Sequence, residues 1–245
     1  MFKKNKLFLS LIFALLMLFT ACTVLSNSQY LSDKNKYELA IQDAIIAEDN
    51  EISNTLIAIN DTNNYIIWNE TENDKKVLAV TWTKYTDSYP VDSSIINSWG
   101  EIWVTIVPEM EDWFKNNYQT GKNYINRTEE LLGLPREKEY THFIEIWVDP
   151  ADLWRPSPDN EITDNSAELE IPADIDSTYL AWYNENIAYS YTPARYPWTR
   201  LGYTYDWGSL TSEIGLSEFI IKKNSQIVVN KVYDNEEYFE MIFKK

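Results

Sequence analysis

The clearest secondary-structure signal in this 245-residue sequence is the stretch Lys76-Val77-Leu78-Ala79-Val80-Thr81-Trp82-Thr83-Lys84-Tyr85. Within it, the large apolar residues Leu78, Val80 and Trp82 alternate with smaller ones, Ala79, Thr81 and Thr83. A period of two places successive side chains on opposite faces of an extended chain. The stretch therefore predicts a half-buried β-strand.

Segments of similar composition lie on both sides of this strand. β-Branched and aromatic residues predict further strands over 55–59, 65–68, 101–107 and 141–148, with turn-forming clusters at 60–64 and 70–74. The segments 216–221 and 226–233 predict a closing hairpin around residues 222–225. Helical spacing of apolar residues predicts helices over 36–50, 109–118, 127–134 and 177–189, and residues 238–243 suit either a strand or a helix.

The order of these segments indicates the fold class. Strands and helices follow one another without the regular alternation of parallel α/β folds. The sequence therefore predicts a single α+β domain, in which an antiparallel or mixed sheet packs against a few helices.

The N-terminus has the features of an export signal. Lys3, Lys4 and Lys6 precede an almost unbroken apolar run over 7–19. This run is shorter than the ~20 residues that a membrane-spanning helix needs, and its basic flank is typical of a secretory signal peptide.

The run ends in Leu18-Phe19-Thr20-Ala21-Cys22, which resembles the lipobox of bacterial lipoproteins, although Phe19 replaces the usual aliphatic residue. The resemblance implies cleavage after residue 21 and attachment of lipid to the Cys22 thiol, the only cysteine of the chain. We then expect residues 1–21 to be a signal peptide, 22–35 a lipidated, flexible tether and 36–245 an extracytoplasmic domain, lipid-anchored to a membrane of the cell envelope. The alternative is an ordinary signal peptide in which Cys22 has no role.

Charge limits the partners of the chain. It carries 38 acidic against 21 basic residues, a formal net charge of −17, and three of the lysines leave with the predicted signal. A surface this acidic repels phosphate backbones, so we expect no nucleic-acid partner.

Most catalytic templates are absent. His142 is the only histidine, which excludes histidine-rich zinc sites, and neither a G-x-S-x-G nor an S-x-x-K motif occurs. We therefore assign no catalytic residue and favour a protein that is not an enzyme.

An acidic region without lysine or arginine extends from 156 to 194. Asp159, Glu161 and Asp164 have spacing suited to Ca²⁺, which prefers oxygen ligands, and Ca²⁺ is the only cofactor that we consider. A solvated acidic loop is the simpler interpretation. A pair of these acids could alternatively act as acid and base in glycoside hydrolysis.

An aromatic segment at 196–208 is the other candidate site. In an extended chain Tyr203, Tyr205 and Trp207 share one face, and flat rings beside charged groups suit stacking on sugars or gripping a peptide. The candidate ligand-binding residues are Trp154, Arg155, Trp198, Arg200, Tyr203, Tyr205, Asp206 and Trp207. The alternative, which we favour, is that these rings fill the core.

Three segments carry a family resemblance. They are Glu130-Leu131-Leu132-Gly133-Leu134-Pro135, Leu153-Trp154-Arg155-Pro156 and Tyr196-Pro197-Trp198-Thr199-Arg200-Leu201-Gly202-Tyr203-Thr204-Tyr205-Asp206. They resemble segments of a family of uncharacterised bacterial proteins, which implies a shared domain over about 101–219 but no activity.

Together these features predict a lipid-anchored envelope protein that binds a glycan or an envelope protein. The alternative functions are a carboxylate-dependent hydrolase of envelope or environmental glycans, and a structural component of an envelope assembly.

Overall fold

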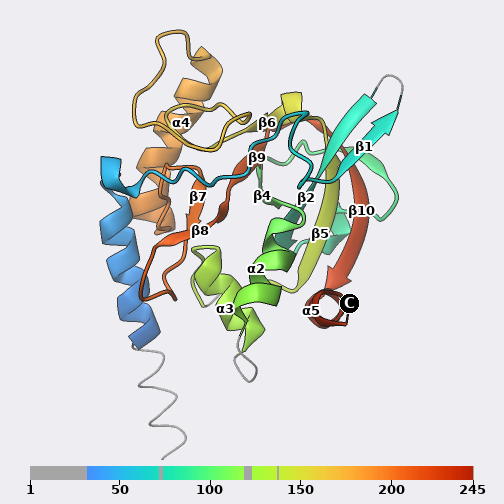
Figure 1. The fold of residues 1–245 in the computed structure, drawn as a ribbon, viewed down its shortest axis with the longest axis horizontal. Helices are drawn as coiled ribbons and strands as arrows, with labels where there is room; N and C mark the ends of the chain where they lie inside the picture. The colour runs from blue at the N-terminus through green and yellow to red at the C-terminus, as the bar shows by residue number, and fades with distance from the viewer. Residues whose placement is uncertain (1–31, 72–73, 119–122, 137, 245) are drawn as a thin grey trace, which may run out of the picture. The chain divides into compact units, whose positions relative to one another are not determined.

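The computed structural model describes residues 32–71, 74–118, 123–136 and 138–244 (Figure 1). The predicted signal peptide and Cys22 lie outside these residues. The chain divides into two units, Met1–Leu39 and Ala40–Lys245. Residues 32–44 form a helix that begins within the predicted tether and ends before the predicted position 50.

An eight-stranded sheet forms the centre of the second unit. Its strands are β1 (Trp68–Thr71), β2 (Asp74–Thr83), β3 (Ser94–Ile96), β4 (Ile102–Ile106), β5 (His142–Val148), β6 (Leu153–Trp154), β9 (Phe219–Ile221) and β10 (Gln226–Asp234). Their order is β3-β10-β5-β2-β4-β9-β6, β1 pairs with β2, and each of these pairings is antiparallel. The predicted α+β class with an antiparallel sheet is confirmed.

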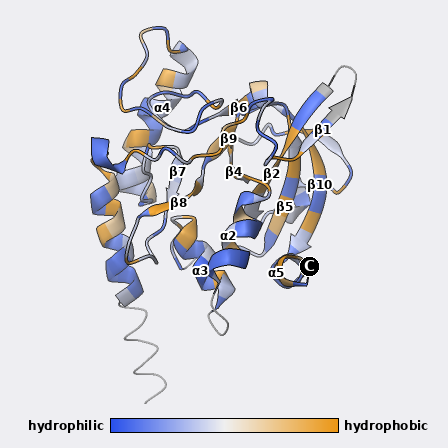
Figure 2. Cartoon of the chain, viewed as in Figure 1, coloured by the Kyte–Doolittle hydropathy of each residue, from blue (hydrophilic) through white to orange (hydrophobic). Residues whose placement is uncertain are grey.

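The strand predicted at 76–85 is central to the sheet, but it is buried on both faces. Val77 and Ala79 join an aliphatic cluster with β5, β9 and β10, whereas Leu78, Val80 and Trp82 join an aromatic cluster with the helices. Both sets are nearly inaccessible because each face of β2 is covered. Hydrophobic residues correspondingly recur along β5 and β10 in Figure 2.

The α-helices that follow β4 in the chain are α2 (Glu109–Asn117), α3 (Tyr124–Leu131), α4 (Ser177–Tyr189), which a π-helical turn (Ser190–Ala194) extends, and α5 (Asn235–Phe243). Three of these four helices begin at a side-chain cap, and α2 follows Pro108 without one. Asp176 accepts hydrogen bonds from the backbone NH groups of Thr178 and Tyr179, and thereby caps α4. Single 3₁₀ turns lie at Asp49–Glu51, Thr86–Ser88 and Pro150–Asp152.

The predicted hairpin over 216–233 is wrong. β9 pairs with β4 and β6, whereas β10 pairs with β5 and β3, so the two strands do not pair with each other. Four antiparallel steps separate them in the sheet, and they therefore run in the same direction. A link of four residues, 222–225, joins them, which requires the sheet to curl strongly at this end.

Two shorter strands were also misplaced. Residues 55–59 form no strand, and they bond to the loop over 162–165 through Leu56 N to Asn165 O and Ile59 N to Ile162 O. The chain turns through 65–67 and β1 begins only at Trp68. β-Propensity predicted a strand at 55–59 incorrectly, because the apolar side chains of this segment pack under a loop and not beside a strand.

A small second sheet pairs β7 (Tyr203–Tyr205) with β8 (Ile214–Ser217). Gly202, just before β7, has a φ of +72°, and a Cβ there would lie 2.8 Å from Cδ of Arg155. Both the conformation and the space require glycine at this position.

Arg155 explains that close approach, because its side chain has no exposed area. Its Nε donates to Glu161 O at 2.8 Å, and its Nη2 donates to Asp164 O at 2.8 Å and to Ile57 O at 3.4 Å. The guanidinium also lies 5.4 Å from the centre of the Phe219 ring. One buried cation thus joins the 159–164 loop, the 55–59 segment and β9.

We predict that Arg155→Met lowers the free energy of unfolding by about 3 kcal/mol, because methionine approximates the volume but leaves backbone carbonyls buried without donors. Urea denaturation measures the change. Lys223→Met, at an exposed position, is the control. A loss below about 0.5 kcal/mol would show that the carbonyls find other donors.

Candidate functional site

The predicted aromatic segment is largely internal. Tyr203 is 1% exposed and donates its hydroxyl to Glu51 O at 3.0 Å. Trp207 is also buried; its Nε1 donates to Leu134 O at 3.1 Å, and the guanidinium of Arg136 lies 4.6 Å from its ring centre. The alternative interpretation, that the rings of this segment fill the core, fits Tyr203 and Trp207.

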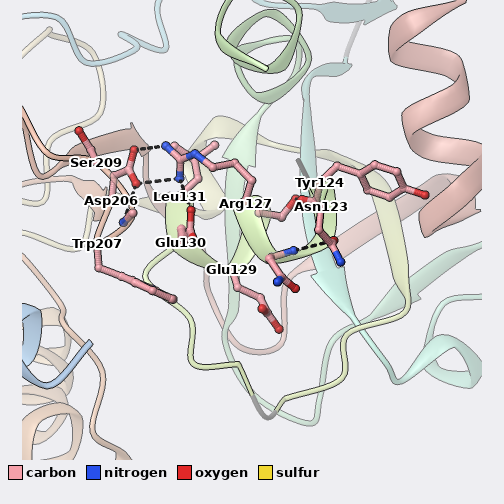
Figure 3. A network of polar contacts seen from close by, with 12 residues as sticks. Asn123, Tyr124, Arg127, Glu129, Glu130, Leu131, Asp206, Trp207 and Ser209 are labelled. Carbon is pink, nitrogen blue, oxygen red and sulfur yellow. Dashed lines mark hydrogen bonds and ion pairs between the residues drawn. The ribbon is translucent and has the colours of Figure 1, made fainter. Parts of the chain in front are cut away.

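Asp206 belongs to a polar network that fixes this segment to α3 (Figure 3). Arg127 donates to both of its carboxylate oxygens, at 2.8 and 2.5 Å, and lies 3.6 Å from Glu130. Arg136 pairs with Glu129 at 3.0 Å and with Glu130. Because each of these acids already has a cation, the network is structural.

The other charged candidates are also engaged. Arg200 donates to Ile45 O at 2.7 Å, and Arg155 is enclosed as described above. Trp154 is half-buried against Tyr179, with ring centres 5.0 Å apart. These residues do not converge with Asp206 in one site.

The acidic loop supports its own backbone. Asp159 accepts from the NH of Glu161, Glu161 from the NH of Thr163 and Asp164 from the NH of Ser166, at 2.9, 2.7 and 3.3 Å. Within the described residues, no group of three or more Asp, Glu, His or Cys side chains is placed to hold a metal ion. A Ca²⁺ site at this loop stays a prediction from sequence.

A cavity of about 450 Å³ lies elsewhere, over the face of the sheet formed by β2 and β4. Its inner walls include the rings of Trp82, Tyr89, Tyr140, Tyr196, Trp198 and Tyr205. Four more exposed rings complete its lining, namely Tyr85, Trp99, Trp103 and Tyr189. Exposed aromatic residues gathered around a concavity are typical of a binding site.

Strand register places the polar floor of this cavity. Val80 of β2 lies opposite Thr105 of β4, and Val104 lies opposite Phe219 of β9. Thr105 follows Val104 in the chain, and Glu218 precedes Phe219 just before β9 begins. Val80, Thr105 and Glu218 all line the cavity.

Glu218 is the most unusual of these groups. Its backbone NH bonds to Gly202 O, but its carboxyl group has no hydrogen-bond partner among the described residues. Burial raises its pKa from 4.5 to about 8, with no cation nearby to oppose the shift. The side chain is partly accessible, through the cavity that it lines.

Three further polar atoms in the cavity walls are buried without a partner within the described structure. They are Thr105 Oγ1, Asn186 Nδ2 and Trp198 Nε1. Buried polar groups are almost always hydrogen-bonded, so these three atoms are unusual. Four other atoms, on Asn97, Arg155, Arg200 and Tyr238, are unpartnered away from this cavity.

A second buried acid lies close in sequence to this floor but serves the fold. Glu109 accepts hydrogen bonds from the backbone NH and the hydroxyl of Ser217, at 3.0 and 2.8 Å. Burial raises its pKa to about 7, and these hydrogen bonds and the charge of Arg155 oppose the shift. Glu109 is satisfied, whereas Glu218 is not.

Of the eight predicted ligand-binding residues, Trp198 and Tyr205 line this cavity. Sequence analysis missed Glu218, Thr105 and Trp103. The signal was present for Glu218, because it is the only charged residue within the apolar segment over 216–221.

Comparisons with protein-family models, with curated proteins and with solved structures returned no match for the chain. Among the described residues, no helix combines the length and the apolar character required to cross a bilayer.

We predict that the stability of the wild-type chain relative to Glu218→Gln falls as the pH rises. A carboxyl group with a higher pKa in the folded chain binds its proton more tightly there, so its ionisation between about pH 4.5 and pH 8 opposes folding. The variant does not titrate, and it should gain on the order of 1–2 kcal/mol over the wild type between pH 4 and pH 9.

Thermal unfolding across this pH range measures the difference. Glu236→Gln, an exposed acid on α5, is the control and should show no pH-dependent gain. A gain that is equal for the two variants would mean that Glu218 is well solvated.

Proposed function

We propose that this protein is a bacterial lipoprotein, anchored through Cys22 on the extracytoplasmic side of a membrane, whose domain binds a small ligand in the aromatic cavity. Sequence supports the anchor, through the basic and apolar signal region and the lipobox-like Leu18–Cys22. The family resemblance of the 130–135, 153–156 and 196–206 segments likewise stays a proposal.

The observation that carries the binding function is the cavity itself. Its walls combine flat rings with a few unpartnered polar groups, Thr105, Asn186, Trp198 and Glu218. Most small-molecule sites are apolar and concave, with a small number of polar groups that fix orientation. Rings such as Trp103 and Trp198 offer faces and edges to the apolar side of a sugar, and a glycan residue is the ligand class that we propose.

The second candidate function is hydrolysis of such a glycan. Glu101 and Glu218 line the same cavity, and the raised pKa of Glu218 suits a general acid near neutral pH. The exposed Glu101 would be the second carboxyl group. Release of reducing ends from a bound oligosaccharide, lost in Glu218→Gln, separates hydrolysis from binding alone.

For the binding function, we predict that Trp103→Ala weakens glycan binding about tenfold or more. Trp103 is 36% exposed, and Trp198 lies edge-on to it with ring centres 6.0 Å apart. Losing a stacking tryptophan typically costs more than ~1 kcal/mol of binding free energy.

Titration of tryptophan fluorescence with a panel of cell-wall and environmental glycans provides the measurement. Tyr65→Ala removes a 40% exposed ring outside the cavity lining and should leave the affinity unchanged. Equal losses in the two variants, or glycan binding untouched by Trp103→Ala, would place the site elsewhere.

For the anchor, we predict that Cys22→Ala abolishes lipidation and shifts the protein from the membrane fraction to the soluble fraction. Two or three acyl chains hold a protein firmly, at ~0.8 kcal/mol for each buried methylene. Metabolic labelling with a radioactive fatty acid measures the change. Thr23→Ala is the neighbouring control, and label retained in Cys22→Ala would contradict the proposal.

A further inference from the structure

All of the charged residues among the described lining of the cavity are acidic. Among the described residues that line it are Glu101 and Glu218 but no lysine, arginine or histidine. Two lysines lie against rings of the lining, Lys138 at 5.2 Å from the centre of Tyr196 and Lys84 at 5.8 Å from that of Tyr85. Neither belongs to the lining. An anionic ligand would therefore meet carboxyl groups and rings in the lining itself, and lysines only behind two of those rings.

The aromatic walls have the same electrostatic sign. A ring face carries the negative part of the aromatic quadrupole and attracts a cation placed above it. Trp82 and Tyr140 lie in contact, with ring centres 5.1 Å apart and planes inclined by 35°, and Trp103 and Trp198 contact each other edge to face. These rings come from different strands and loops, so they surround the space from several sides.

Glu218, at the floor of the cavity, is the acid that would balance such a cation. Glu218 and Thr105 both line the cavity, and neither side chain has a hydrogen-bond partner in the described structure. Other acids inside the described structure have partners: Asp206 binds Arg127, Glu129 binds Arg136, and Glu145 accepts a hydrogen bond from Asn230. An acid left without a cation at the floor of an aromatic cavity has its natural partner in a ligand.

We propose that the cavity binds a small ligand through a cationic nitrogen, which the aromatic rings surround and Glu218 balances as counter-ion. This inference rests on the proposed function, and deepens it by naming the charge of the ligand. The source of the nitrogen is either an amino sugar or a quaternary ammonium compound. Burial that raises the pKa of Glu218 to about 8 agrees with this role, because the site then holds either a proton or the ligand's positive charge.

The test compares ligands of equal shape and different charge. Choline and 3,3-dimethylbutan-1-ol differ in the positive nitrogen, and glucosamine and N-acetylglucosamine provide the sugar pair. Each is titrated calorimetrically into the purified full-length chain, kept soluble in a detergent without choline or sugar groups. We expect the cationic member of at least one pair to bind about tenfold more tightly than its neutral partner. Which pair shows the preference identifies the source.

Two variants test whether Glu218, at the floor of the cavity, causes the preference for the cationic ligand. Glu218→Gln should bring the affinities of the two members within about twofold of each other, while Glu101→Gln, at an exposed acid of the same cavity, should keep most of the preference. The thermal unfolding midpoint verifies that each variant is folded.

Several outcomes would overturn the inference. They are equal binding of charged and neutral members, a preference that survives in Glu218→Gln, and no binding of any of the four compounds. If neutral glycans bind in a Trp103-dependent manner while the cationic compounds show no advantage, the proposed function stands and the inference about charge fails. If no glycan depends on Trp103 but choline binds through Glu218, the cavity is a cation site and the glycan class is wrong.

Discussion

A guanidinium group cut off from water must find its acceptors inside the protein, and Arg155 finds them in three backbone carbonyls from two separate segments. Desolvating an unpaired charge costs several kcal/mol, so these segments must converge on it in every folded molecule. The same constraint fixes Gly202, because any larger residue there would collide with the arginine stem. The hydroxyl of Tyr179, on α4, donates to the carbonyl of Arg155 at 2.9 Å and extends the constraint to that helix.

The partners of the other acids inside the fold set the carboxyl group of the cavity apart. Asp206, Glu129 and Glu109 are each surrounded by donors or cations, and the acidic loop uses its carboxylates to bond its own backbone. Glu218 differs from these acids, because none of the described residues donates a hydrogen bond to its carboxyl group, and burial raises its pKa. The binding role that we propose would account for such a residue.

How much of this the sequence could predict depended on the range of the interactions. β2, α2, α4 and β5 were placed within a residue or two, because each is decided by local periodicity, caps and breakers. The pairing partners of β9 and β10 were predicted incorrectly, because the curl of the sheet that separates these strands is set by contacts between residues far apart in the sequence. The candidate site failed for the same reason. Thr105 and Glu218 line one cavity only because β4 pairs with β9, and the arginine partner of Asp206 lies 79 residues earlier.

Internal pairing does not remove the acidic excess of the chain. The sequence has a formal charge of −17; inside the fold Arg127 and Arg136 bind acids, and Arg155 binds backbone carbonyls. Each arginine–acid pair removes one charge of either sign, so the rest of the chain keeps its excess of acids and a negative field. Such a field raises the local concentration of cations and speeds their approach, while it slows anions. The negative field of the chain would therefore favour the cationic ligand that we propose for the cavity, before the ligand contacts the rings and Glu218.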